Sequence, residues 1–192
     1  GPQHVSDVLE HHPLCEMFVQ GAHDLGVRGN PDYNGESQEG VSYYQRTILN
    51  GRRHSAATAF LDPIRNRVNL RIITDALVER LTFEGKQVKG VVFQKNQRTE
   101  EVRAGKEILL SAGSINSPKI LQLSGVGNAE FLRNLGIEVI HDLKGVGEGF
   151  QDHYAIRVAN RVKGLQTLNE RGRGISLIWE ILKWFATGKG LL

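Results

Sequence analysis

Apolar residues recur at helical spacing in two stretches near the ends of the chain. Between His12 and Leu25 they fall at every third or fourth position, and Gly26 can end the helix. Near the other end, Thr167 or Asn169 can cap a helical region that carries a second stripe. This stripe consists of Ile175, Ile178, Trp179, Leu182 and Phe185. We expect it to pack in a core, as surface helices usually do; a membrane-surface or partner helix is the alternative.

Alternating apolar positions predict strands in the first half of the chain. A strand is expected over 41–49, followed by a turn at Asn50-Gly51 and a helix of small residues ending near Asp62-Pro63. Four further strand candidates lie at 69–74, 76–83, 88–94 and 99–103. Because turn residues separate them, they are expected to form a meander of short antiparallel strands.

The next segment has the pattern of a strand, a tight turn and a helix. Ile108 to Leu110 are all apolar, as in a strand of a parallel sheet that is buried on both faces. Ser111-Ala112-Gly113 are too small to keep another molecule away. Asn116 or Ser117 can then cap a helix with Pro118 in its first turn, which Ser124-Gly125 ends.

This crossover has two interpretations. The carboxyl ends of parallel strands and the amino ends of the following helices are where α/β proteins place anionic cofactors. A turn that merely needs small residues would have the same composition. Beyond it, Asn128 can cap a short helix that Gly136 closes. A strand at 137–140, a glycine-rich loop at 143–149 and a strand at 154–162 complete the prediction.

Composition narrows the class of protein. Of 192 residues, 40% are hydrophobic and 22 are glycines, which favours a loop-rich α/β protein. The net charge of +3 is spread along the chain, so nucleic-acid binding is not expected. Cys15 is the only cysteine and excludes an internal disulfide. Neither a signal peptide nor an apolar run of membrane-spanning length is visible.

The segment from Gly113 to Pro118, followed by Leu123-Ser124-Gly125-Val126-Gly127, resembles the second signature of the glucose–methanol–choline (GMC) family of flavin-dependent alcohol oxidoreductases. Seven further segments, before and after this one, resemble other landmarks of the family and occur in the family's order. They are Asp32-Tyr33-Asn34-Gly35, Gln38-Glu39-Gly40, Asn50-Gly51-Arg52-Arg53, Ser55 to Ala59, Leu135-Gly136-Ile137, Gly145-Val146-Gly147 and Gln151-Asp152-His153. The resemblance covers nearly the whole chain.

The resemblance implies a mixed α/β fold: part of an FAD-binding, Rossmann-like domain with a β-meander, plus pieces of an antiparallel-sheet substrate domain. The substrate domain would take 1–49 and 151–192, and the FAD domain 50–150. It implies FAD as the cofactor, with the backbone of Val78 against the adenine. Ser111, Ala112 and Gly113 would closely approach the nucleotide.

Two family features are absent from the sequence. No G-x-G-x-x-G dinucleotide fingerprint is present, and GMC enzymes carry it near their N-terminus. Their catalytic His lies near the C-terminus, so no catalytic residue is assigned here. We therefore expect the central fragment of an enzyme, inactive by itself and lacking the N- and C-terminal parts of its own chain. The intact enzyme would oxidise a primary alcohol to an aldehyde by hydride transfer to flavin.

The substrate has alternatives. Choline-acting relatives tend to have a glutamate two residues after the Asp-His pair, and this chain has Ala155, with Tyr154 as the only cation–π face. A neutral alcohol is therefore favoured over choline, with choline dehydrogenase as the first alternative and a non-catalytic interaction module as the second. A homodimer and a cytoplasmic location, or a peripheral one at the inner membrane, are further expectations.

Seven histidines raise the question of metal binding. His11, His12 and His23 lie on or beside one helix, but their spacing gives no close ligand pair with carboxylates, so no metal site is expected. His153 is expected to hold the glycine-rich loop by hydrogen bonds, and a role as an acid or base is the alternative.

Overall fold

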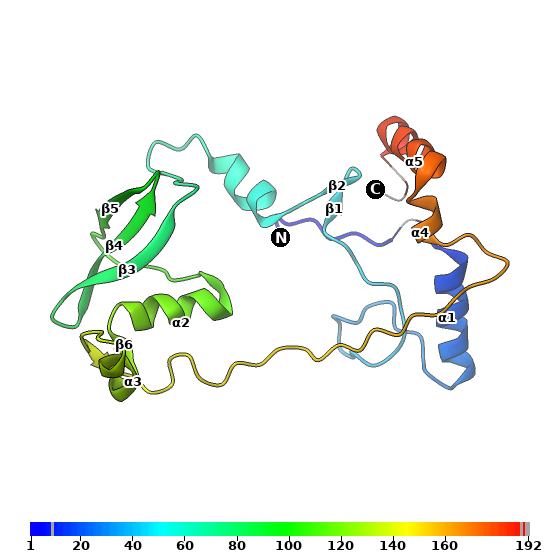
Figure 1. Ribbon diagram of the computed structural model, residues 1–192. Helices are drawn as coiled ribbons and strands as arrows, with labels where there is room; N and C mark the ends of the chain where they lie inside the picture. The colour runs from blue at the N-terminus through cyan, green and yellow to red at the C-terminus, as the bar shows by residue number, and fades with distance from the viewer. Residues whose placement is uncertain (9, 189, 191–192) are drawn as a thin grey trace. The chain divides into compact units, whose positions relative to one another are not determined.

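The computed structural model describes residues 1–8, 10–188 and 190 (Figure 1). The chain forms two compact units. The first combines residues 1–71 with 158–192, and the second consists of residues 72–157. The division into domains at residues 49 and 150 stays a prediction, because these units are defined only by contacts within this chain.

A three-stranded antiparallel sheet dominates the second unit. Its strands are β3 (Leu77–Glu84), β4 (Gln87–Lys95) and β5 (Arg98–Arg103), in the order β3-β4-β5. The two tight turns need left-handed backbone, which Gly85 supplies at one and Asn96-Gln97 at the other. The predicted meander is confirmed. The additional strand predicted at 69–74 is wrong, since no strand within residues 1–8, 10–188 and 190 pairs with this segment.

Helix α2 (Gly113–Leu123) packs against β3 and closes the core of the second unit. The buried apolar side chains come from β3, β4, α2 and the segment after α2: Leu81, Val92, Phe93, Ile120, Val126, Ala129 and Leu132. Ser124 is the buried polar residue among them. Its hydroxyl accepts a hydrogen bond from the Leu81 amide (2.8 Å) and donates one to the Ile120 carbonyl (2.5 Å). The end of α2 is thereby fixed to the middle of β3.

The crossover into α2 differs from the prediction. Ile108 and Leu110 are half-buried and Leu109 is exposed, but no strand pairs with this segment in the described part of the chain. The helix begins at Gly113 instead of near Pro118, and Pro118 lies inside it. Pro118 is the sixth residue of the helix, so it has no amide to donate to the Ser114 carbonyl and the helix lacks that hydrogen bond.

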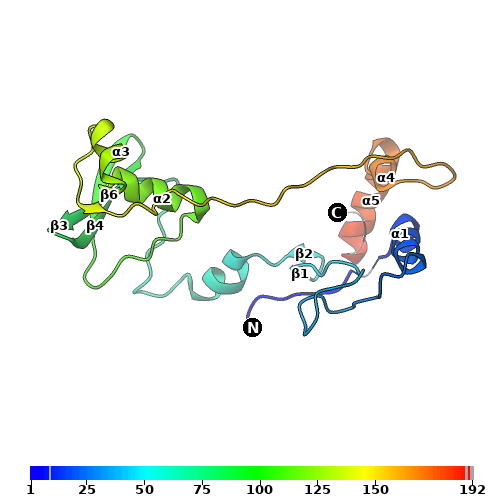
Figure 2. The same ribbon diagram turned by 90° about the horizontal axis from the view of Figure 1, so that it is seen from below.

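A short parallel pair follows α2. Strand β6 (Val126–Gly127) pairs with β7 (His141–Asp142), and α3 (Ala129–Asn134) connects them. Figure 2 shows β6 next to α3. The predicted cap is confirmed, since the Asn128 side chain accepts hydrogen bonds from the amides of Glu130 and Phe131. The strand predicted at 137–140 is wrong, since the strand forms at the two residues that follow, 141–142. Residues 141–142 form a strand because they pair with β6, and β6 was not predicted from the sequence.

The first unit is built from two segments that are far apart in the sequence. Its N-terminal segment holds α1 (Pro13–Asp24), the hairpin of β1 (Ile48–Leu49) and β2 (Arg52–Arg53), and the helical turns η1 (Ala57–Leu61) and η2 (Asp62–Ile64). The helix at 12–25, the Asn50-Gly51 turn and the small-residue helix are confirmed. The strand over 41–49 is mostly absent, being reduced to β1 and the single bridges of Val41 and Arg46.

The C-terminal segment of this unit contains α4 (Leu168–Arg171) and α5 (Gly174–Thr187). Residues 154–162, predicted as a strand, are irregular and largely exposed. The apolar stripe of α5 is also exposed, with Ile175 at 76% and Phe185 at 74%, so the predicted core packing is not found among the described residues. No helix in the described part of the chain has the length and apolar character to cross a bilayer.

Thr167 begins α4 with a reciprocal capping arrangement. Its hydroxyl accepts from the Glu170 amide, while the Glu170 carboxylate accepts from the Thr167 amide (2.6 Å) and hydroxyl (2.9 Å). The backbone hydrogen bond from Thr167, and then the hydroxyl bond, lower the pKa of Glu170.

We predict that the stability of α4 depends on pH through this carboxylate. A carboxyl whose pKa is lowered by folding stabilises the folded state above its unfolded pKa, and the contribution disappears as pH falls through the folded pKa. Protection of the α4 amides, after correction for intrinsic exchange rates, should therefore fall on acidification, and the Glu170→Gln variant should lose this dependence. Equal acid dependence in both proteins would contradict the prediction.

Candidate functional site

The turn before α2 exposes its main chain. Ser111, Ala112 and Gly113 are all exposed, and a Cβ built on Gly113 would meet no atom within 4 Å. Gly113 has φ of 87°, a conformation that favours glycine. The Ser117 hydroxyl accepts from the Ala112 amide (3.0 Å), which holds the turn against the first turn of α2. The amides at the start of α2 therefore lie beside an open approach.

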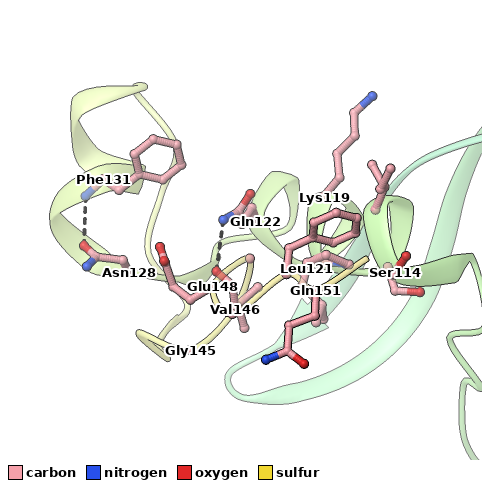
Figure 3. A pocket seen from close by; sticks show the side chains of 16 residues that line it. Ser114, Lys119, Leu121, Gln122, Asn128, Phe131, Gly145, Val146, Glu148 and Gln151 are labelled. Atoms are coloured by element: carbon pink, nitrogen blue, oxygen red, sulfur yellow. Dashed lines mark hydrogen bonds between the residues drawn. The ribbon is translucent and has the colours of Figure 1, made fainter. Parts of the chain in front are cut away.

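A cavity of about 860 Å³ begins at Ser114, the residue after this turn (Figure 3). One wall is α2, from Ser114 to Gln122, and the opposite wall is the glycine-rich segment 145–151. Asn128 and Phe131, at the start of α3, close one end. The charged lining residues are Lys119 and Glu148. The cavity thus lies between the helix that carries the first part of the GMC-like signature and the loop that carries the landmark Gly145-Val146-Gly147.

The glycine-rich loop is held by Gln122. The side-chain amide of Gln122 donates to the Val146 carbonyl (3.1 Å), as Figure 3 shows. The expected role of His153 in holding this loop is wrong for the described residues, because the only hydrogen bond there is from the His153 amide to Asp152. Gln122 was missed because a glutamine in a helix carries no motif; its proximity to the loop is created by the fold.

Val78 lies half-buried in β3, where it pairs with Phe93. The register between β3 and β4 shifts between Val78 and Arg80, so the backbone is irregular beside the expected adenine contact. Strand β3 is at the edge of its sheet. One side of its main chain is therefore not covered by a neighbouring strand. Because α2 packs on β3, Val78 and the turn at Ser111 to Gly113 belong to the same compact unit.

A second cavity, of about 460 Å³, lies in the same unit. Its lining is mainly apolar and includes Leu81 and Val88 of the sheet, Ile108 and Leu110 of the extended segment, and Ile140. The two half-buried residues of the predicted parallel strand thus face this apolar space together with the antiparallel sheet.

The N-terminal histidines form local contacts. His11 stacks on Tyr43 with a centroid distance of 4.1 Å, and its Nδ1 lies 2.7 Å from a Glu16 carboxylate oxygen. Loss of hydration, followed by the hydrogen bond to Glu16 and its charge, raises the pKa of Tyr43 to about 12. His12 caps α1, accepting from the Leu14 amide. No group of three metal-ligating side chains occurs among the described residues.

Comparison with known proteins identifies relatives among the GMC oxidoreductases. The profile of the family described as GMC oxidoreductase matches residues 1–155. An oxygen-dependent choline dehydrogenase of Staphylococcus saprophyticus is 42% identical over 178 residues, covering 93% of this chain and 32% of that protein. The mitochondrial choline dehydrogenase of Homo sapiens is 39% identical over 192 residues, covering 99% of this chain and 32% of its own.

Two solved structures are similar to the chain. An FAD-dependent oxidoreductase from Chaetomium thermophilum has a TM-score of 0.86 at 29% identity, covering 99% of this chain and 34% of its own. The crystal structure of pyridoxine 4-oxidase from Mesorbium loti has a TM-score of 0.68 at 35% identity, covering 74% of this chain and 28% of its own.

The chain spans about a third of the length of these relatives. The mixed α/β fold class expected from the sequence is confirmed. The structure combines helices with antiparallel sheets, and it is similar to the structure of an FAD-dependent oxidoreductase. A profile that covers most of the chain, together with a crossover that exposes its main chain beside a cavity, establishes the family. The chain belongs to the GMC oxidoreductase family.

Proposed function

We propose that this chain is the central part of an FAD-dependent enzyme that oxidises an alcohol. The observation that carries the proposal is the exposed turn Ser111-Ala112-Gly113, which presents the amino end of α2 next to a cavity of about 860 Å³. Backbone amides at a helix start suit the phosphates of a dinucleotide, because they are unpaired donors at the positive end of the helix dipole.

The residues of the turn fit such a cofactor. Gly113 leaves open space where a side chain would stand, and Ser111 adds a hydroxyl. We assign the nucleotide contact to the main chain of Ser111, Ala112 and Gly113. The adenine contact goes to the main chain of Val78, on the uncovered side of an edge strand. Bound FAD would supply the hydride acceptor for the carbon that carries the hydroxyl group.

This chain contributes binding and orientation to the reaction. The walls of α2 and the loop at 145–151 would position whatever occupies the cavity between them. We assign no catalytic base within residues 1–192. The proton of the alcohol would pass to a group elsewhere in the intact enzyme, and the segment by itself is expected to be inactive.

We propose a neutral primary alcohol as the substrate, oxidised to the aldehyde. The support is Ala155, which offers no negative charge where a quaternary ammonium would need one; Tyr154, 91% exposed, offers only an aromatic face. Choline is the second candidate, favoured by the names of the relatives that are 36–42% identical to this chain. The homodimer and the cytoplasmic or peripheral inner-membrane location stay predictions.

The test compares two proteins: the complete polypeptide encoded around this segment, and residues 1–192 alone. We expect the complete protein to purify with the visible absorption bands of oxidised flavin, and residues 1–192 to bind FAD weakly or not at all. Under anaerobic conditions, a primary aliphatic alcohol should bleach the flavin faster than choline does. Faster bleaching by choline would favour the second candidate. A complete protein that takes up no flavin would overturn the proposal.

A further inference from the structure

The glycine-rich loop at 145–151 has few attachments to the rest of its unit. Its own backbone bonds are local, from the Val146 amide to Leu143 and from the Glu148 amide to Gly145. Among the described residues, the side chain that hydrogen-bonds to it from another element is Gln122 of α2, through the Val146 carbonyl (3.1 Å). The position of this wall of the cavity therefore depends strongly on one amide group.

Two glycines give the Gln122 side chain its space. A Cβ on Gly147 of the loop would lie 2.6 Å from the Gln122 Nε2 atom, closer than packed atoms tolerate. A Cβ on Gly127 of β6 would lie 3.2 Å from the Gln122 Cγ atom. The side chain thus runs through a slot with a glycine near its stem and another at its tip. Gly147 also has φ of 87°, which only glycine adopts easily.

The orientation of the side chain agrees with this arrangement. In Figure 3 the Gln122 amide points from α2 to the loop; Glu148 and Gln151 belong to the loop itself and also line the cavity. Neither Glu148 nor Gln151 makes a side-chain hydrogen bond to α2 in the described part of the chain. Lys119, one helical turn before Gln122, lines the same cavity, but among the described residues it makes no hydrogen bond to the loop. The attachment is specific to Gln122.

We propose that Gln122 is a positioning residue, which holds the loop at 145–151 against α2 and so sets the width of the cavity. The effect of Gln122 on the reaction rests on the proposed function, in which the cavity walls orient the cofactor and the alcohol. Gln122 acts through Val146 and is not assigned contact with either molecule. Loss of its bond would let a loop with glycines at 145, 147 and 149 move away from α2.

The test uses three variants of the complete protein. Gln122→Met keeps the length of the side chain but cannot donate to Val146. Gln122→Glu keeps the shape, cannot donate while ionised, and regains an O–H donor when protonated. Gln94→Met is the matched control, because Gln94 is an exposed glutamine on β4, away from the cavity. Hydrogen exchange of the amides at 145–149 is the main readout, and KM for the alcohol is the second.

We expect Gln122→Met to accelerate exchange in the loop by roughly three- to tenfold, the range of one neutral hydrogen bond, while β3 to β5 stay unchanged. KM should rise more than kcat falls. Gln122→Glu should behave like Gln122→Met at neutral pH, and its loop exchange should return toward wild type, after correction for intrinsic rates, as the new carboxyl is protonated.

The exchange readout separates this inference from the proposed function. If the complete protein holds no flavin but the loop responds to Gln122→Met, the proposed function fails and the positioning role stands. If flavin binds and the loop exchanges alike in Gln122→Met and Gln94→Met, the positioning role is overturned. Should Gln122→Met fail to fold, the pH series on Gln122→Glu decides, and exchange that does not change with protonation overturns the inference.

Discussion

The Gly113→Ala variant of the complete protein is expected to bind FAD at least about tenfold more weakly than the unchanged protein. A Cβ at φ of 87° costs roughly 1–2 kcal/mol, so the turn would change its backbone conformation to relieve it. The new methyl group would also stand in the space through which a nucleotide reaches the main chain. Both effects act on the step that the proposal assigns to this turn.

Gly136→Ala is the matched control for this prediction. Gly136 follows α3 with φ of 72°, and a Cβ there would also meet no atom within 4 Å. The two variants should therefore lose similar stability, on the order of 1–2 kcal/mol, measured by denaturant unfolding. Only Gly113→Ala should lose FAD, measured as flavin released on dilution. Equal FAD affinity in the two variants would contradict the assignment of Ser111, Ala112 and Gly113.

Gly125→Ala is expected to be the more damaging substitution for the fold, with a loss of about 2–5 kcal/mol in the free energy of unfolding. Gly125 has φ of 83°, and a Cβ there would overlap the Glu138 carbonyl oxygen and lie 2.8 Å from the Ile140 Cγ1 atom. The backbone strain and the steric overlap therefore both lower the free energy of unfolding. The Gly125 carbonyl also accepts from the amides of Ile140 and His141, so its displacement would disturb the pairing of β6 with β7.

Urea unfolding of Gly125→Ala and Gly136→Ala measures the difference directly. Both substitutions place a methyl group on left-handed backbone, but only the first meets packed atoms. Gly125→Ala should be clearly less stable or fail to accumulate as folded protein. A midpoint for Gly125→Ala equal to that of Gly136→Ala would show that the backbone near Glu138 gives way, against this prediction.

Local signals in the sequence were sufficient for most of the helices and for the meander. The Asn128 cap, the Thr167 cap and the Asn50-Gly51 turn use side chains or glycine to satisfy neighbouring backbone groups, and such contacts are visible in the sequence itself. The strands of the meander are joined by short turns, so each strand finds its partner within the same stretch of chain. No distant segment is needed to form them.

Elements that depend on distant partners were predicted poorly. Residues 41–49 and 154–162 alternate like strands, yet they lack a full partner among the described residues and stay mostly irregular. The segment Ile108 to Leu110 is extended but unpaired for the same reason. In contrast, β6 has only two residues, Val126 and Gly127, too few for a hydrophobic pattern, and it becomes a strand because β7 reaches it.

The candidate site was predicted in part. Ser111, Ala112 and Gly113 were identified from small residues after an apolar run, and the structure leaves them exposed. Their contact with a nucleotide, like that of Val78, stays a prediction. The cavity itself could not be foreseen, because it is formed by α2 and a loop more than twenty residues later.

Strand β5 has a consequence for self-association. All six of its residues are exposed, and their order, Arg-Thr-Glu-Glu-Val-Arg, has charges that are symmetric about the middle. If the same strand of a second copy paired with it antiparallel over its full length, Arg98 would face Arg103 and Glu100 would face Glu101. Like charges directly opposite each other destabilise such a ladder. The edge strand β5 therefore disfavours pairing with β5 of a second copy, and this protects the protein from forming a continuous intermolecular sheet.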